Sequence, residues 1–343
     1  MPSWSEILNE LQQTNIQIKA PPFDTVRRKY LQLLYKKTGR NTILYATAWT
    51  KTGLIVHPDL LSITEEDIQG LMEVVHGLQG KELDLIIHSP GGSPEAAEAF
   101  VSYLRKKFDD IRVIIPYAAM SAATMISCSA NKILMANHSY IGPIDPQMII
   151  PTQFGLRAVP AYAILQQFDY ATDDAKKDPK KLASWMPLLS QYPPGILIQC
   201  MNAIDLSEEL VSKWLKNYMF KGKKDATKRA KKIANELSNH DEFKTHGRHI
   251  DKEQARKIGL EVEDLEKDQE LQDLVLSVYH ATTHTFGGTS AVKIIENHLG
   301  KAYVSQSQQI SIQLPPIITQ EQPPTKPSPL PEGTTPPESD KPN

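Results

Sequence analysis

Three short apolar segments, each separated from the next by a helical segment, constrain the fold more than any other feature of this sequence. "LDLIIH" (83–88), "IRVIIP" (111–116) and "KILMA" (132–136) are largely apolar without alternation, which predicts strands buried on both faces. The segments between them, "SPEAAEAFVSYLRKKF" (93–108) and "SAATMISCSA" (121–130), have helical character. Short links between strands and helices are typical of parallel strands joined by right-handed crossovers. We therefore expect an α/β fold.

The rest of the chain divides into regions of different character. We predict an N-terminal helical arm (1–40), an α/β domain (41–306) with a helical insertion at about 157–240, and a tail (307–343). The tail is rich in proline and polar residues, cannot bury a core, and is predicted to be disordered. Within the first two regions, 41–49 is a predicted strand, and the further predicted helices span 4–37, 62–78, 252–258 and 264–281.

Charge and cysteine content exclude several classes of protein. A net charge of −2 over 343 residues is too balanced for a nucleic-acid or membrane-surface footprint. Two cysteines, Cys128 and Cys200, do not make a disulfide framework, which favours a reducing compartment.

The first 13 residues are acidic and lack an apolar core, so we expect no signal peptide. The uncharged runs 113–131 and 182–204 contain prolines and many polar side chains, so we expect no membrane span and a cytoplasmic protein.

The first loop with candidate chemistry is "HSPGGSPEA", which follows the strand 83–88. Gly91 and Gly92 permit positive φ angles and a close approach to the main chain. Their N–H groups precede a predicted helix N-terminus, where negative charge is favoured, as in an oxyanion site. Taken alone, however, the two glycines are better explained by a simple strand-to-helix turn.

The second loop is "PYAAMSAAT", which follows the strand 111–116 and contains Ser121 among small residues. Alone, Ser121 is most simply a helix N-cap. The two loops follow successive strands of a parallel sheet, so both are expected at the same edge. One loop then supplies N–H donors and the other supplies a hydroxyl group, which is the combination that an acyl-transfer site requires.

Four segments of the sequence resemble those of a known superfamily. "LDLIIHSPGGSPEAAEAF", "AAMSAATMIS", "ANHSYIGPIDPQ" and "DKEQARKIGL" resemble the Clp-type serine peptidases, which include signal peptide peptidase A. The group most similar to this chain is that of the serine dehydrogenase proteinases, and the similarity extends from about Asp24 to about Tyr303. The resemblance implies a crotonase-like fold of the Clp protease type, a repeated strand-strand-helix spiral with helical additions. It also implies a homo-oligomer, because members of the superfamily form rings or stacked dimers.

The resemblance further implies a serine endopeptidase. Ser121 corresponds to the nucleophile of the family. The oxyanion hole corresponds to Gly91 or Gly92 together with the main-chain N–H of Ala122. No cofactor or metal is implied, and no histidine pair in the sequence has a spacing specific for a metal.

Two kinds of residue are candidates for the general base. In the Clp subunit a histidine follows the nucleophile by one strand. At the corresponding place this chain has "SYIGPIDPQ", which contains Asp145 and no histidine. His246 falls near the position of the Clp aspartate. We therefore expect a Ser121–His246–Asp145 set, since triads recur in different chain orders. The alternative base is a lysine, as in signal peptide peptidase A, and Lys176 or Lys181 in "DDAKKDPKKLASW" are the candidates.

The lysines are the less favoured base, because the neighbouring aspartates keep an ammonium group charged.

Four other histidines are considered as candidate site residues: His88, His138, His249 and His284. Of these, His138 and His249 are expected to be structural.

Two other functions are compatible with the same fold. One is a catalytically inactive scaffold that binds a peptide or protein partner, and the other is acyl-CoA chemistry, for which no basic adenine pocket is evident. The sequence contains no G-x-x-x-x-G-K-[ST] loop, so a nucleotide-hydrolysing partner, if needed, is a separate chain. The expected partners are therefore a peptide or protein substrate and further copies of this chain.

Overall fold

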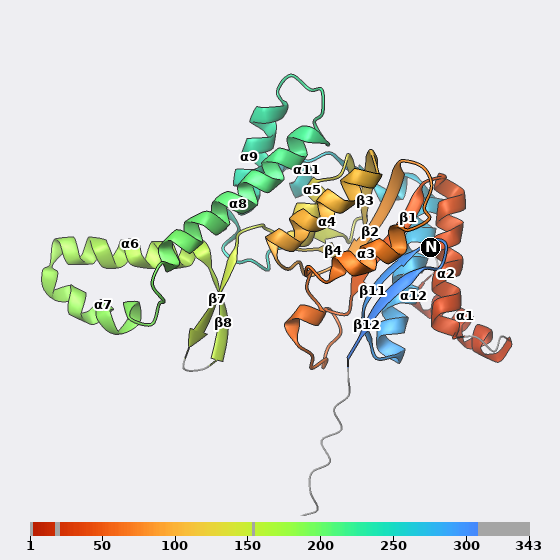
Figure 1. Ribbon diagram of the computed structural model, residues 1–343, viewed down its shortest axis with the longest axis horizontal. Helices are drawn as coiled ribbons and strands as arrows, with labels where there is room; N and C mark the ends of the chain where they lie inside the picture. The colour runs from red at the N-terminus through yellow and green to blue at the C-terminus, as the bar shows by residue number, and fades with distance from the viewer. Residues whose placement is uncertain (1–2, 18–20, 153–154, 308–343) are drawn as a thin grey trace, which may run out of the picture. The chain divides into compact units, whose positions relative to one another are not determined.

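The computed structural model describes residues 3–17, 21–152 and 155–307, and most of the predicted tail lies outside these residues. Its centre is a seven-stranded sheet in the order β10-β5-β3-β2-β1-β11-β12 (Figure 1). From β10 to β1 all neighbouring strands are parallel, and β11 pairs with β1 and β12 in antiparallel fashion. The strands are β1 (Asn41–Thr47), β2 (Glu82–His88), β3 (Asp110–Ile115), β5 (Lys132–Met135), β10 (Val262–Asp264), β11 (Ala291–Asn297) and β12 (Ala302–Gln306). The prediction of an α/β fold with a largely parallel sheet is confirmed.

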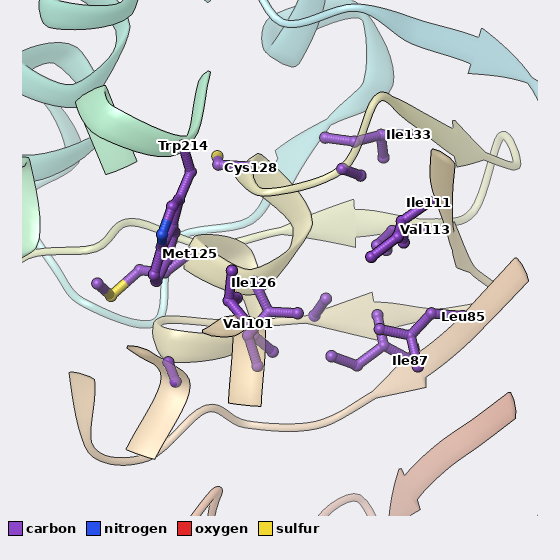
Figure 2. Close-up of a cluster of buried hydrophobic side chains, with 14 of the residues drawn as sticks. Leu85, Ile87, Val101, Ile111, Val113, Met125, Ile126, Cys128, Ile133 and Trp214 are labelled. Atoms are coloured by element: carbon purple, nitrogen blue, oxygen red, sulfur yellow. The ribbon is translucent and has the colours of Figure 1, made fainter. Parts of the chain in front are cut away.

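Helices cover both faces of this sheet, which is why its central strands are largely apolar on both faces. On one face, Leu85 and Ile87 of β2 pack with Val101, Ile126 and other side chains of the covering helices (Figure 2). On the other face, the intervening Ile86 packs in a second core with side chains of the N-terminal and C-terminal helices. Because successive side chains of a strand point to opposite faces, a strand between two helical layers is apolar along most of its length.

The helices largely lie in the predicted segments, except that one segment is divided and the helix predicted at 264–281 begins at Gln269 and extends to Gly288. The predicted helical segment 4–37 contains two helices, and the second begins at Pro22, which lacks an N–H and is suited to a first helical turn. The helices are α1 (Trp4–Gln17), α2 (Pro22–Thr38), α3 (Asp67–Val75), α4 (Pro94–Lys107), α5 (Ala122–Cys128), α6 (Ala161–Lys177), α7 (Leu182–Leu189), α8 (Ile196–Asn217), α9 (Ala226–Ser238), α10 (His240–Phe243), α11 (Lys252–Ile258) and α12 (Gln269–Gly288). In the described part of the chain, no helix combines the length and apolar character needed to cross a membrane.

Two smaller sheets lie outside the central one. The first consists of β4 (Ala118–Ala119), β6 (Tyr140–Ile141) and β9 (Ile250–Asp251), and its strand β4 directly follows the carboxyl end of β3 in the chain. The second is the hairpin of β7 (Gln147–Thr152) and β8 (Gly155–Pro160), which leads into α6. The hairpin and the helices α6 and α8 share a small core of their own around Ile150, Ile164 and Cys200.

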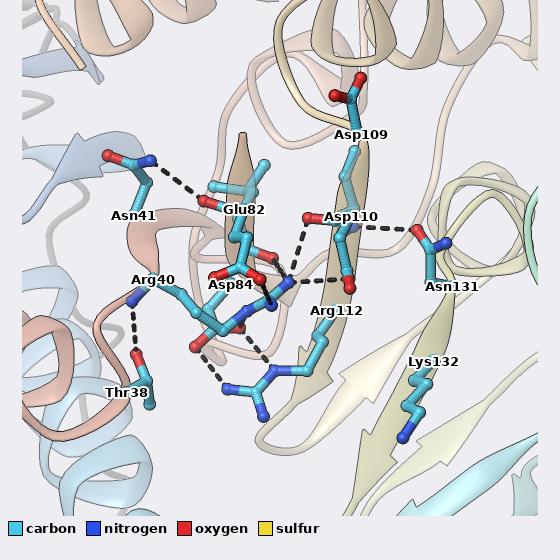
Figure 3. A network of polar contacts seen from close by, with 12 residues as sticks. Thr38, Arg40, Asn41, Glu82, Asp84, Asp109, Asp110, Arg112, Asn131 and Lys132 are labelled. Carbon is cyan, nitrogen blue, oxygen red and sulfur yellow. Dashed lines mark hydrogen bonds and ion pairs between the residues drawn. The ribbon is translucent and has the colours of Figure 1, made fainter. Parts of the chain in front are cut away.

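A buried ionic network joins the amino ends of the central strands (Figure 3). The fully buried Asp84 of β2 accepts hydrogen bonds from Arg40 at 2.9 Å and from both Nε and Nη2 of Arg112 at 2.7 Å. Arg40 also binds Asp110 at the start of β3, at 2.9 Å. Since a buried carboxylate is tolerated only when it is paired and hydrogen-bonded, these contacts fix the amino ends of β2 and β3. The candidate site lies at the opposite, carboxyl ends of the same strands.

Candidate active site

Main-chain hydrogen bonds join the two loops singled out in the sequence. Ser89, directly after β2, donates its N–H to the carbonyl of Ala118 at 3.1 Å. In return, Met120 donates its N–H to the carbonyl of Ser89 at 3.0 Å. This pairing continues the parallel arrangement of the central strands beyond their ends, and it brings the Gly-Gly loop alongside Ser121.

Glycine is required at both positions of the Gly-Gly loop. Gly91 has φ +101°, and a Cβ atom there would lie 2.6 Å from the Met120 carbonyl oxygen and 2.8 Å from the Ala122 nitrogen. A Cβ on Gly92 would lie 2.2 Å from the carbonyl oxygen of Ile63. Ile63 holds the loop by donating its N–H to Gly91 and accepting from Ser93, at 2.7 Å and 3.1 Å. The loop is therefore packed between Ile63 on one side and the Ser121–Ala122 peptide on the other.

The N–H groups of this loop differ in their availability. Gly91 donates its N–H to Ser89 Oγ at 3.2 Å. Within the described residues, the N–H groups of Gly92 and Ala122 make no hydrogen bond to another group of the chain. Of the three N–H groups expected from the sequence, only that of Gly91 therefore has a hydrogen-bond partner among the described residues.

Ser121 has an unusual main-chain conformation, with φ 49° and ψ −119°. Among the described residues other than glycine, it shares a positive φ only with Lys244. Such a conformation costs roughly 1–3 kcal/mol and is concentrated at functional sites. Ser121 precedes α5 in the N-cap position, but its side chain forms no capping hydrogen bond. The simple capping explanation therefore does not account for this hydroxyl.

Asp145 and His246 meet although they lie 101 residues apart in the chain. Their Oδ1 and Nδ1 atoms are 2.7 Å apart, and the Asp145 side chain is 3% exposed. Because a carboxylate can only accept a hydrogen bond, the proton of a neutral His246 lies on Nδ1 and the lone pair on Nε2. His246 and Ser121 both line one cavity of about 780 Å³.

This cavity is bounded by segments from distant parts of the chain. Its walls include the loop around Ile63, the Gly-Gly loop, the start of β7 and one side of α8. A volume of this size accommodates a drug-sized ligand or several peptide side chains. Many of its lining side chains are apolar, among them Ile63, Met125, Ile144, Met148, Ile149 and Leu206.

The alternative lysine bases lie elsewhere. Lys176 is 72% exposed and pairs with Asp173 at 3.3 Å, and Lys181 is 51% exposed and pairs with Asp174 at 3.5 Å. Neither lysine lines the cavity that contains Ser121. The structure thus brings His246 and Asp145 together at this cavity and leaves both lysines outside it.

The other histidines have different surroundings. His88 is buried against Trp49 and Tyr279, and burial lowers its pKa to about 4. His138 Nε2 lies 3.0 Å from the carbonyl of Pro116, His249 stacks on Tyr140, and His284 Nε2 lies 2.9 Å from the carbonyl of Trp4. In the part of the chain that the structure describes, no three His, Cys, Asp or Glu side chains form a cluster that could hold a metal ion.

Sequence reasoning missed two side chains at this site. His240 Nδ1 lies 3.0 Å from Asp145 Oδ2, and Gln147 donates its Nε2–H to the same oxygen at 3.2 Å. Gln147 lies two residues after Asp145 and could have been considered from spacing alone. His240 is 95 residues away, and its position six residues before His246 is the only signal that the sequence contains.

Comparison with known proteins identifies similar families and relatives. The family model described as "ClpP-like SDH-type serine proteinase" matches residues 14–285 of this chain. Two uncharacterised proteins of Methanocaldococcus jannaschii are similar in sequence. The first is 34% identical over 133 residues, which are 38% of this chain and 46% of that protein. The second is 36% identical over 87 residues, which are 25% of this chain and 30% of that protein. The matches thus span less than half the length of these curated relatives.

A structural similarity is also found. A serine-to-alanine mutant of the 1510-N membrane-bound stomatin-specific protease is similar over 62% of this chain and 79% of that chain. The sequence identity is 16% and the TM-score is 0.33.

Proposed function

Because this chain belongs to the family of ClpP-like SDH-type serine proteinases, we propose that it hydrolyses peptide bonds through an acyl-enzyme formed on Ser121. The observation that carries this proposal is the 2.7 Å contact between Asp145 and His246, with His246 on the same cavity as Ser121. The family is one of serine proteinases, so a peptidase role is supported independently of the geometry.

The proposed reaction has two steps. In the first, Ser121 Oγ attacks the scissile carbonyl while His246 Nε2 accepts the hydroxyl proton, and His246 then donates that proton to the leaving amine. Asp145 orients the imidazole and stabilises its charged form. The N–H groups of Gly92 and Ala122 bind the oxyanion of the tetrahedral intermediate. In the second step, water attacks the acyl-enzyme with the same base and releases the product acid.

The positive φ of Ser121 supports this assignment. A strained turn between a strand and a helix exposes the hydroxyl and directs the next N–H toward the same point, as at the nucleophile of other serine hydrolases. The hydroxyl makes no cap, and its residue lines the cavity. A peptide is proposed to bind in extended form along the Gly-Gly loop. A non-catalytic scaffold is not favoured, because the matching family is one of proteinases.

We also propose that the working form is a homo-oligomer in the cytoplasm. The predicted apolar segment 182–204 corresponds to α7 and the beginning of α8, where several large apolar side chains are exposed to solvent. These are Leu182, Met186, Leu188, Ile198 and Met201. Exposure of so many large apolar side chains in one segment is unfavourable in water and is reduced by association. Light scattering at micromolar concentration tests this, and a monomer mass contradicts it.

The function is tested by reaction with a fluorophosphonate and by hydrolysis of unfolded protein substrates. Wild-type protein is expected to be labelled and active, and Ser121→Ala is expected to lose activity by roughly 10⁴-fold or more. Ser121→Ala is expected to keep its thermal stability, because the hydroxyl caps no helix. Wild-type turnover in the Ser121→Ala protein contradicts the proposal.

A further inference from the structure

The carboxylate of Asp145 accepts hydrogen bonds from three side chains, and they are distributed unequally between its oxygens. Oδ1 faces His246 alone, at 2.7 Å. Oδ2 faces His240 Nδ1 at 3.0 Å and Gln147 Nε2 at 3.2 Å. Asp145 is buried, and the His240 side chain is only 15% exposed, so these are contacts inside the protein rather than surface contacts. The role of His240 is not explained by the reaction as described above.

We propose that His240 is a positioning residue, which fixes the rotation of the Asp145 carboxylate so that Oδ1 is presented to His246. This inference rests on the proposed function. The carboxylate is joined to its chain by single bonds and can rotate unless its oxygens are held. Two donors on Oδ2 define the plane of the group, which leaves Oδ1 directed at His246 Nδ1.

The tautomer of His240 follows from the same contacts. Since the carboxylate accepts, a neutral His240 donates from Nδ1, as His246 does. His240 does not line the cavity that contains Ser121, whereas His246 does. Its geometry therefore suits it to act through Asp145 rather than on the substrate. Groups that orient metal ligands typically contribute about 10- to 100-fold to activity, and an effect of the same size is expected here.

The local structure holds His240 in place. Asn239 precedes the short helix α10, and its side chain accepts hydrogen bonds from the N–H groups of Asp241 and Glu242. Asp241 also accepts a hydrogen bond from the hydroxyl of Tyr162 on α6, at 2.7 Å. Tyr162→Phe removes this neighbouring contact without touching Asp145, so it is a matched control for loss of structure around α10.

Full-length wild type, His240→Leu, His240→Asn and Tyr162→Phe are compared by peptide hydrolysis and by the rate of fluorophosphonate labelling. His240→Leu is expected to lower kcat and the labelling rate by about 10- to 100-fold with KM little changed. His240→Asn retains an N–H donor near the position of Nδ1 and is expected to recover most of the loss. Tyr162→Phe is expected to retain wild-type rates.

Equal loss in His240→Leu and His240→Asn, or equal rates in His240→Leu and wild type, overturns the inference. If His240→Leu does not fold, Gln147→Leu, which removes the other donor to Oδ2, is tested with His240→Asn. The inference is supported if Gln147→Leu lowers kcat while His240→Asn remains active. A wild-type kcat in Gln147→Leu overturns it.

A spectroscopic measurement separates this inference from the proposed function. The proton that His246 Nδ1 shares with Asp145 is expected to give a far-downfield NMR signal in the wild type, and this signal is expected to shift or broaden in His240→Leu. A downfield signal with no labelling of wild type refutes the peptidase proposal alone. An unchanged signal in His240→Leu refutes the positioning role even where the peptidase proposal stands.

Discussion

Replacing Gly91 by alanine tests how the two loops cooperate. Gly91 has φ +101°, and an added Cβ would lie 2.6 Å from the Met120 carbonyl oxygen and 2.7 Å from Ser121 Cβ. The left-handed conformation costs an alanine about 1–2 kcal/mol. Because two of the three nearest atoms belong to the main chain and cannot rotate away, overpacking adds about 1–3 kcal/mol. We therefore expect Gly91→Ala to lower the free energy of unfolding by about 2–5 kcal/mol.

The same substitution is expected to reduce activity as well as stability. Relief of the clash requires the Gly-Gly loop and the Ser121–Ala122 peptide to separate, which moves both proposed oxyanion donors. A misplacement of about 1 Å costs roughly 100-fold in rate. The assays are urea unfolding followed by circular dichroism, and fluorophosphonate labelling under conditions where the variant is folded.

Gly39→Ala is the matched control. Gly39 ends α2 with φ +67°, and a Cβ atom there has no neighbour within 4 Å. It shares the conformational cost of about 1–2 kcal/mol without the clash. Gly39→Ala is expected to label at the wild-type rate. If Gly91→Ala labels as fast as Gly39→Ala, the two loops are not coupled as described.

Three further outcomes are expected. Lys293→Met leaves Asp67 buried without its 2.6 Å partner and is expected to cost about 3–5 kcal/mol in urea unfolding; wild-type stability contradicts this. His246→Gln is expected to lose peptidase activity while Lys181→Met retains it, and the opposite result moves the base to the lysine. Burial lowers the His88 pKa from 6.5 to about 4, so the unfolded chain binds this proton first as the pH falls. The stability that the neutral, buried His88 contributes above pH 6.5 is therefore lost as the pH falls toward 4. The free energy of unfolding of His88→Leu should fall less over this pH range than that of the wild type. An identical pH dependence in both proteins contradicts this.

The sequence predicted the central strands well and the site only in part. The strands expected at 83–88, 111–116 and 132–136 correspond to β2, β3 and β5 within one residue at each end. This succeeded because burial on both faces produces a run of mostly apolar residues without alternation, which is a local signal. The neighbouring positions of the Gly-Gly loop and Ser121 followed from the parallel topology and needed no further information.

The polar partners could not be found in this way. The contact between Asp145 and His240 depends on the path of the chain through β7 and β8 and the helices α6 to α9, which no local pattern specifies. The choice between Gly91 and Gly92 as a donor depends on a single hydrogen bond from Gly91 to Ser89 Oγ. The strained conformation of Ser121 is likewise a property of the pairing between loops rather than of the residues alone.

The measurement that tests the central claim most directly is mass spectrometry of the full-length protein after reaction with a fluorophosphonate. We expect one adduct per chain, mapped to the peptide that contains Ser121. Labelling should be absent in Ser121→Ala and strongly slowed in His246→Gln. An adduct on another serine, or equal labelling of wild type and Ser121→Ala, contradicts the assignment of Ser121 as the nucleophile.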